Sequence, residues 1–149
     1  MTLLHHAGVC VRDLDESLRF YRDGIGLSVL ADVVLDADLA PLLGVTTTSV
    51  RTVFLGAADR PDAGIVELLS LGVESVDGGA PQAGTPARGV FLLSLQVDVD
   101  AVLTRLADLG FDPTPLTMPT PGGGKAATVV DPDGVMVELL PLGGLSVVQ

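Results

Sequence analysis

The chain has 149 residues, of which 48% are hydrophobic; this length and composition suit one folded domain with a sizeable core and exclude a disordered chain. Its formal charge of −11 argues against nucleic acid and anionic membrane surfaces as partners, and no apolar run is long enough to span a membrane. The single cysteine, Cys10, excludes an internal disulfide, and together with the lack of a signal-peptide pattern it favours a cytoplasmic protein.

The first half of the chain predicts one helix and four main strands. Asp13 is placed to cap the helix, Glu16 closes a capping box, and the helix ends at Gly24 and Gly26. Apolar residues at helical spacing give the helix one buried face, made of Leu14, Leu18, Tyr21 and Ile25. Strands are expected at residues 3–11, 27–35, 46–55 and 64–71, with a short helical or irregular turn at 37–43.

The second half repeats this order after a segment rich in Gly, Pro, Ala and Ser. Strands are expected at residues 89–97, 112–118, 125–130 and 135–140, and a helix begins at Asp98 and ends at Gly110. The prediction is a single α+β domain, 1–149, built from two βαβββ modules in tandem. Module one is 1–71, the linker is 72–88, module two is 89–141, and an apolar tail, 142–149, either packs on a partner subunit or frays.

Each module carries one glutamate inside an otherwise apolar strand. The sequence PDAGIVELL at residues 61–69 contains Glu67, and PDGVMVELL at residues 132–140 contains Glu138. A carboxylate in such a strand is costly to desolvate unless a neighbouring group compensates it. Since the same cost recurs at the same place in both modules, we expect Glu67 and Glu138 to share a task, which is either metal binding or proton transfer, with a purely structural role as the remaining alternative.

Alternation along the strands predicts which residues share a face with these glutamates. His6 shares its face with Cys10, Glu67 with Ile65, and Glu138 with Met136. His5 is expected on the opposite face from His6. Aligning Val11 with Val97 places Leu92 at the position of His6, with Ser94 and Gln96 on the same side. A slip of one residue would place Phe91 there instead. The second module therefore keeps its glutamate but has no counterpart of the histidine.

These motifs resemble the vicinal oxygen chelate superfamily, which includes glyoxalase I, methylmalonyl-CoA epimerase, extradiol dioxygenases and bleomycin-resistance proteins. The matching segments are HAGVCVRDLD at residues 6–15, FY at 20–21, VELL at 66–69, VD at 97–98, and DPDG at 131–134 ahead of a second VELL. The resemblance implies that the two modules lie side by side, with their mixed β-sheet curled into a cup and the helices outside. It also implies a homodimer and a small-molecule substrate or ligand.

The resemblance further implies four metal-ligand positions, one on each of four strands. These correspond to His6, Glu67, residue 92 and Glu138, and Leu92 cannot be a ligand. The remaining His/Glu/Glu set could hold a divalent ion, such as Zn, Ni, Co, Mn or Fe, with water or substrate completing the coordination. The alternative is that no metal binds and the carboxylates act as general acids or bases. The missing ligand argues against dioxygenase chemistry.

Several further residues are candidates for contact with a ligand. Arg51 could bind a carboxylate or phosphate, and an exposed strand arginine is the equally weighted alternative. The other predicted lining residues are Cys10, Leu92, Ser94, Gln96 and Met136. The glycine run before Lys125 lacks the spacing of a phosphate-binding loop and is expected to form a loop over the cup.

Two functions follow. The first is an enzyme with lyase, isomerase or cyclase-type chemistry on a small oxygenated substrate, in which His6, Glu67 and Glu138 stabilise or generate an enolate-like intermediate. The second is a metal-free protein that sequesters a hydrophobic small molecule, as resistance proteins of the superfamily do. Apolar positions around Leu92 and Met136 favour the second, whereas the shortage of aromatic residues counts against it.

Overall fold

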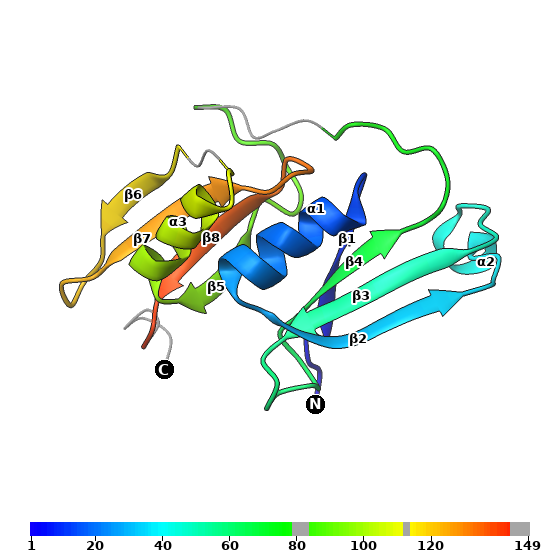
Figure 1. Cartoon of the computed structure of the whole chain (residues 1–149), viewed down its shortest axis with the longest axis horizontal. Coiled ribbons are helices and arrows are strands. Elements are labelled where there is room, and N and C mark those ends of the chain that lie inside the picture. Colours follow the sequence, from blue (N-terminus) through cyan, green and yellow to red (C-terminus); the bar gives the residue numbers. More distant parts are fainter. Residues whose placement is uncertain (79–83, 112–113, 144–149) are drawn as a thin grey trace. The chain divides into compact units, whose positions relative to one another are not determined.

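The computed structural model describes residues 1–78, 84–111 and 114–143, and the predicted α+β class with two βαβββ repeats is confirmed. The chain divides into two compact units, each of which contains one four-stranded mixed sheet. Unit 1 comprises residues 1–22 and 26–77, and unit 2 comprises residues 23–25 and the chain from Gly78 onward. Figure 1 shows the sheet of each unit with its helix.

The sheet of unit 1 has the strand order β1-β4-β3-β2. Strand β1 (His6–Cys10) pairs in parallel with β4 (Ile65–Ser70), which pairs antiparallel with β3 (Val50–Gly56). Strand β2 (Ser28–Leu35) completes the sheet as the antiparallel neighbour of β3. The glutamate-bearing strand β4 is therefore central, which satisfies its backbone on both edges.

The helix after β1 begins as predicted but changes character. Asp13 is its N-cap and accepts a hydrogen bond from the backbone N of Glu16 at 3.2 Å. The α-helical part, α1 (Leu14–Leu18), continues into η1 (Arg19–Ile25), a stretch of π-helix that ends at Gly26 with φ 95°. The four residues predicted as the buried face are all buried: Leu14, Leu18, Tyr21 and Ile25.

The sheet of unit 2 repeats the arrangement in the order β5-β8-β7-β6. Strand β5 (Leu93–Val97) pairs in parallel with β8 (Met136–Pro141), which pairs antiparallel with β7 (Lys125–Val130). Strand β6 (Leu116–Pro119) pairs with β7 and is an edge strand, as the neighbouring prolines predicted. Helix α3 (Val99–Asp108) contacts β7 and β8 and begins at its N-cap Asp98.

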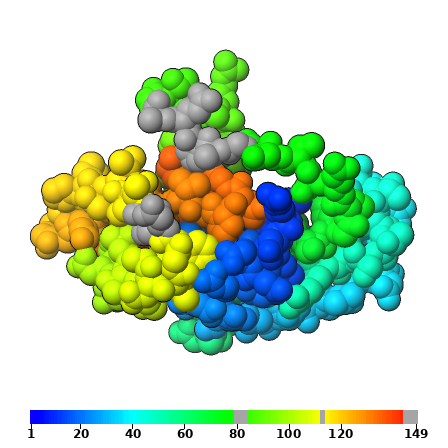
Figure 2. All heavy atoms as spheres, turned by 45° about the horizontal axis from the view of Figure 1, so that its top comes forward, coloured from blue at the N-terminus to red at the C-terminus, as the bar shows by residue number. Residues whose placement is uncertain are grey.

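In each unit one face of the sheet carries the buried core, and the other face carries the glutamate. Alternate residues of the central strands are fully buried on the helix side, as at Leu68 in β4 and Leu139 in β8. The opposite face is more exposed, and the edge strands contribute much of that exposure: β6 lies on the surface, among the yellow segments in Figure 2. We call the face that carries Glu67 or Glu138 the glutamate face, and the other the helix face.

The strand boundaries differ from the predicted ones mainly at the N-terminal ends. Residues 3–5, 46–49 and 89–92 lie outside the strands they were predicted to open, whereas β7 has the predicted bounds. The turn before β8 forms because Asp131 Oδ1 accepts hydrogen bonds from the backbone N of Asp133 and of Val135, both at 2.8 Å. The short helix α2 (Ala40–Leu43), closed by Gly44, lies within the predicted turn.

Some predictions fall outside the described residues. The tail beyond residue 143, part of the linker (79–83) and the start of the predicted strand at 112–118 belong to this group. Among the helices that the structure does describe, none is long and apolar enough to cross a membrane.

Candidate functional site

The glutamate face of unit 1 brings His6 and Glu67 together, as predicted from strand alternation. His6 Nε2 lies 3.3 Å from Glu67 Oε1, although the two residues are on different strands and His6 is two residues out of register with Glu67. The residue directly opposite Glu67 on β1 is Gly8. A side chain there would approach the carboxylate, since an added Cβ would lie 3.6 Å from Glu67 Oε1. That distance is an ordinary van der Waals contact, and the tighter neighbour of the added Cβ would be Leu69 Cδ1 at 3.2 Å.

The second carboxylate oxygen of Glu67 is held from the other side. Thr52 Oγ1 on β3 donates a hydrogen bond to Glu67 Oε2 at 2.8 Å, and Thr52 is 4% exposed. The Glu67 side chain is 13% exposed, against 40% for that of His6. Phe54, directly opposite Glu67 on β3, presents its ring edge-on to His6 at a centroid distance of 5.9 Å. The cost of desolvating the carboxylate is thus offset by two polar partners.

A second histidine joins this group, contrary to the prediction that His5 points away. His5 Nδ1 lies 2.9 Å from His6 Nδ1, because His5 precedes β1 and is not bound by strand alternation. One of these nitrogens must donate and the other accept. His5, His6 and Glu67 thus lie in a row, with a hydrogen bond between the two imidazole rings and the Glu67 carboxylate at ion-pair distance from His6 Nε2.

The glutamate face of unit 2 is built differently around Glu138. Ser94, directly opposite on β5, donates from Oγ to Glu138 Oε1 at 2.8 Å. On the other side of the strand, Thr128 of β7 lies directly opposite Glu138. The register places Leu92 at the position of His6, since Glu67 pairs with Gly8 and Glu138 with Ser94. The strand pairing thus agrees with the predicted alignment of Leu92 with His6.

In each module a hydroxyl group donates a hydrogen bond to the glutamate, but it comes from the antiparallel neighbour in unit 1 and from the parallel neighbour in unit 2. In unit 1 the hydroxyl comes from the antiparallel strand β3, through Thr52, and the parallel strand offers Gly8. In unit 2 it comes from the parallel strand β5, through Ser94, and the position equivalent to Thr52 is Ala126. Strand alternation predicts that Thr52 and Phe54 share one face of β3, but only the pairing of β3 with β4 shows that this is the Glu67 face.

His6 and Glu67 are chemically suitable as two ligands of a divalent ion, because imidazole nitrogen and carboxylate oxygen are ordinary donors for such ions. Their donor atoms already converge, and His6 has a hydrogen-bonded partner on its other nitrogen, as metal-binding histidines usually do. Within neither unit do three or more His, Cys, Asp or Glu side chains of the described residues gather into a metal-binding group. The third predicted ligand, Glu138, belongs to unit 2.

Arg51 lies on the helix face of its sheet, not on the face of Glu67. Its Nε and Nη2 donate to the two carboxylate oxygens of Asp32 on β2, at 3.0 and 2.7 Å, and Asp15 of α1 lies 4.0 Å away. The hydrogen bonds from Arg51 hold the pKa of Asp32 below its ordinary value; desolvation opposes this effect, and the positive charge of Arg51 adds to it. The same pairing raises the pKa of Arg51.

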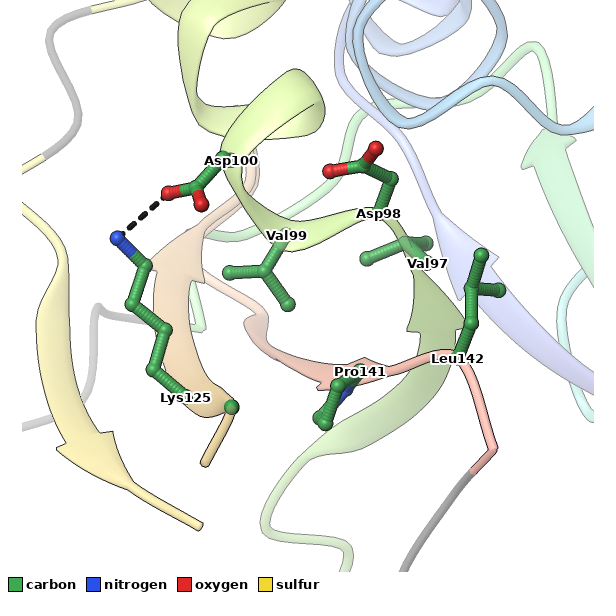
Figure 3. Close-up of a pocket in the computed structure, with 8 residues that line it drawn as sticks. Val97, Asp98, Val99, Asp100, Lys125, Pro141 and Leu142 are labelled. Carbon is green, nitrogen blue, oxygen red and sulfur yellow. Dashed lines mark ion pairs between the residues drawn. The ribbon is translucent and has the colours of Figure 1, made fainter. Parts of the chain in front are cut away.

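Lys125 occupies the equivalent place in unit 2. Its Nζ lies 2.6 Å from Asp100 Oδ1, and Asp100, like Asp15, is the second residue of its helix. Figure 3 shows this ion pair at the edge of an open pocket of about 250 Å³ near the start of α3. The pocket is lined by Val97, Asp98, Val99, Asp100, Gly124, Lys125, Pro141 and Leu142, and none of the predicted site residues is among them.

The remaining predicted residues lie on the glutamate faces or just before them. Cys10 is exposed on the Glu67 face, and Gln96 is exposed on the Glu138 face. Met136 is half-buried beside Glu138, and Leu92 is half-buried immediately before β5.

Replacing Arg51 is expected to return the pKa of Asp32 to its ordinary range. Because the folded-state pKa is depressed, the stability that the pair contributes is present above the unfolded pKa of about 3.9 and is lost as the pH falls through the folded value. Carbon-detected NMR titration of Arg51→Gln should show that the pKa of Asp32 rises. Arg60→Gln, which removes the loop cation 3.9 Å from Asp62, is the control. An unchanged Asp32 titration in Arg51→Gln would contradict the assignment.

Replacing Thr52 by valine is expected to destabilise the fold by about 1–3 kcal/mol, since Glu67 Oε2 loses its donor in a largely buried position. Thr52→Ser should recover most of the loss. Thr128→Val is the matched control, because no hydrogen bond from the Thr128 side chain to Glu138 is present in the described residues. Urea unfolding measures all three, and equal costs for Thr52→Val and Thr128→Val would show that the hydrogen bond contributes nothing.

Comparison with known proteins identifies the family of the chain. The sequence profile of the Glyoxalase/Bleomycin resistance protein/Dioxygenase superfamily matches residues 3–139. The lactoylglutathione lyase-like protein terB of Aspergillus terreus (strain NIH 2624 / FGSC A1156) is 33% identical over 146 residues, which cover 92% of this chain and 74% of terB.

Solved structures share the fold. A glyoxalase family protein from Bacillus cereus has a TM-score of 0.75 at 15% identity, covering 98% of this chain and 96% of that one. TnmS3, an antibiotic binding protein from Streptomyces sp. CB03234, has a TM-score of 0.56 at 22% identity, covering 95% and 96%. From the profile match over nearly its whole length and its similarity to terB, the chain belongs to the Glyoxalase/Bleomycin resistance protein/Dioxygenase superfamily.

Proposed function

We propose that the protein is an enzyme that acts on a small oxygenated molecule by lyase, isomerase or cyclase-type chemistry through an enolate-like intermediate. The observation that carries the proposal is the contact between His6 and Glu67, 3.3 Å apart on a face of otherwise mostly apolar residues. A carboxylate with a histidine neighbour is suited to moving a proton to or from carbon beside a carbonyl group. Similarity to a lactoylglutathione lyase-like protein supports this class of reaction.

In the proposal, His6, Glu67 and Glu138 are the catalytic residues and the candidate ligands of a divalent ion. Such an ion, when bound, would act as a Lewis acid toward the substrate oxygen. Glu67 is held in place by His6 and Thr52, whereas one oxygen of Glu138 accepts from Ser94. In the proposal, the second oxygen of Glu138, Oε2, accepts the proton that leaves the substrate.

The substrate-lining residues in the proposal are Cys10, Leu92, Ser94, Gln96 and Met136, all on the glutamate faces or beside them. Arg51 is left out because Asp32 holds its guanidinium on the helix face.

The second candidate is a metal-free protein that binds a hydrophobic small molecule. The observation in its favour is the exposure of large apolar side chains on the Glu138 face, where Leu116 is 75% and Met118 66% exposed. Binding of a ligand with no chemical change, together with no bound metal, would select this candidate over the enzyme.

The metal is tested on protein purified without chelators, by elemental analysis and by melting with and without a chelator. Leu92→His should tighten metal binding, because it supplies the missing fourth ligand, whereas Phe91→His places a histidine one residue away and should not. Glu67→Gln should weaken binding at least about tenfold, the lower end of the cost of losing even a second-shell partner of a ligand. Glu74→Gln, an exposed carboxylate of the linker, is its control.

Catalysis is tested with the hemithioacetals that methylglyoxal forms with uncharged thiols, following product formation. Turnover that survives substitution of both Glu67 and Glu138 by glutamine would refute the roles assigned to them. Loss of turnover in Glu67→Gln with full activity in Glu74→Gln supports them.

The proposal includes a homodimer in the cytoplasm. Sedimentation equilibrium should give twice the monomer mass of 15.2 kDa, and a monomer at all concentrations would exclude the dimer.

A further inference from the structure

The charged residues of the described strands are distributed unevenly between the two faces of each sheet, with both cations on the helix faces. The described strands contain five such residues: Asp32, Arg51, Glu67, Lys125 and Glu138. Glu67 and Glu138 lie on the glutamate faces. Both cations lie on the helix faces, because Arg51 alternates with Thr52 in β3 and Lys125 precedes Ala126 in β7.

Both strand cations are also already paired. Arg51 makes a two-point contact with Asp32, and Lys125 pairs with Asp100 of α3. No lysine or arginine of the described strands is therefore available on either glutamate face to neutralise a negatively charged ligand.

The rest of the glutamate faces is apolar or uncharged. The edge strand of unit 2 presents Leu116 and Met118, and β7 presents Val130, which is 48% exposed. In unit 1, β2 presents Val33 and Leu35, 38% and 42% exposed. A ligand on these faces meets apolar side chains, hydroxyls, His6 and the carboxylates.

We infer that the ligand is uncharged: a neutral, largely apolar molecule that carries carbonyl or hydroxyl oxygens, and not an anionic thiol conjugate or a phosphate-bearing ester. An anion would lose hydration at an apolar surface without gaining a cationic partner, and the carboxylates and the overall charge of −11 would repel it. The inference rests on the proposed function for its choice of binding face, and it narrows the substrate class of that function.

The test uses two fluorescent probes with the same aromatic skeleton: neutral N-phenyl-1-naphthylamine and its sulfonated analogue 1-anilinonaphthalene-8-sulfonate. The neutral probe should bind at least about tenfold more tightly, which corresponds to about 1.4 kcal/mol. Added salt should reduce the preference, because screening weakens repulsion of the sulfonate, whereas a difference in hydrophobicity alone would not respond in this way. The titrations are made with and without chelator, and the preference should hold in both.

A charge-insertion pair assigns the effect to the glutamate face. Met118→Lys places a cation on this face, and Thr117→Lys places the same charge on the neighbouring residue of β6, which is also exposed but lies on the other face. Met118→Lys should shift the preference toward the sulfonated probe by severalfold more than Thr117→Lys does.

Three outcomes would overturn the inference. They are equal or tighter binding of the sulfonated probe to the unaltered protein, no binding of the neutral probe, and equal effects of the two lysine insertions. A fourth result would also overturn it: loss of sulfonate binding in Arg88→Gln would show that Arg88, in the loop before β5, is a cationic partner for an anion. The probe titrations depend neither on a bound metal nor on turnover. Failure of the proposed function can therefore be distinguished from failure of this inference.

Discussion

The structure of each unit depends on how a carboxylate is accommodated in the central strand of its sheet. Glu67 has hydrogen-bonded strands on both sides, and its side chain is largely buried. His6 and Thr52 flank its two oxygens. An isolated charge in that position would be strongly destabilising, so these neighbours make the strand possible. The same contacts aim the carboxylate into the face where the proposed chemistry takes place, which joins stability and function in one group of side chains.

Strand alternation and the internal repeat account for most of what could be predicted from the sequence. They identified the two βαβββ modules, the shared face of His6 and Glu67, and Leu92 as the equivalent of His6, all of which the strand pairing confirms. The helix beginning at Asp13 was also predictable, because a capping residue and apolar spacing are local signals. The common set of His6, Glu67 and Glu138 stays a prediction.

Other contacts were not predicted because they depend on register or on residues outside regular strands. Arg51 was considered a ligand-binding residue by type, but its partner Asp32 is on a different strand, and which face they share becomes evident only from the pairing. His5 contacts His6 because the strand begins three residues later than predicted, which frees His5 from alternation. The π-helical stretch at 19–25 has no sequence signal that we can identify, since its residues are ordinary helix formers ending at glycines.

The pairing of Arg51 and Lys125 with acidic residues bears on how the two halves diverged. Equivalent positions on the helix faces keep the same character in both modules, from the cation near the start of the strand to the buried Leu68 and Leu139. On the glutamate faces the equivalents mostly differ: histidine against leucine, glycine against serine, phenylalanine against threonine. If the halves descend from one duplicated ancestor, the helix faces were retained while the glutamate faces specialised separately, and only one of the two glutamate faces carries a histidine.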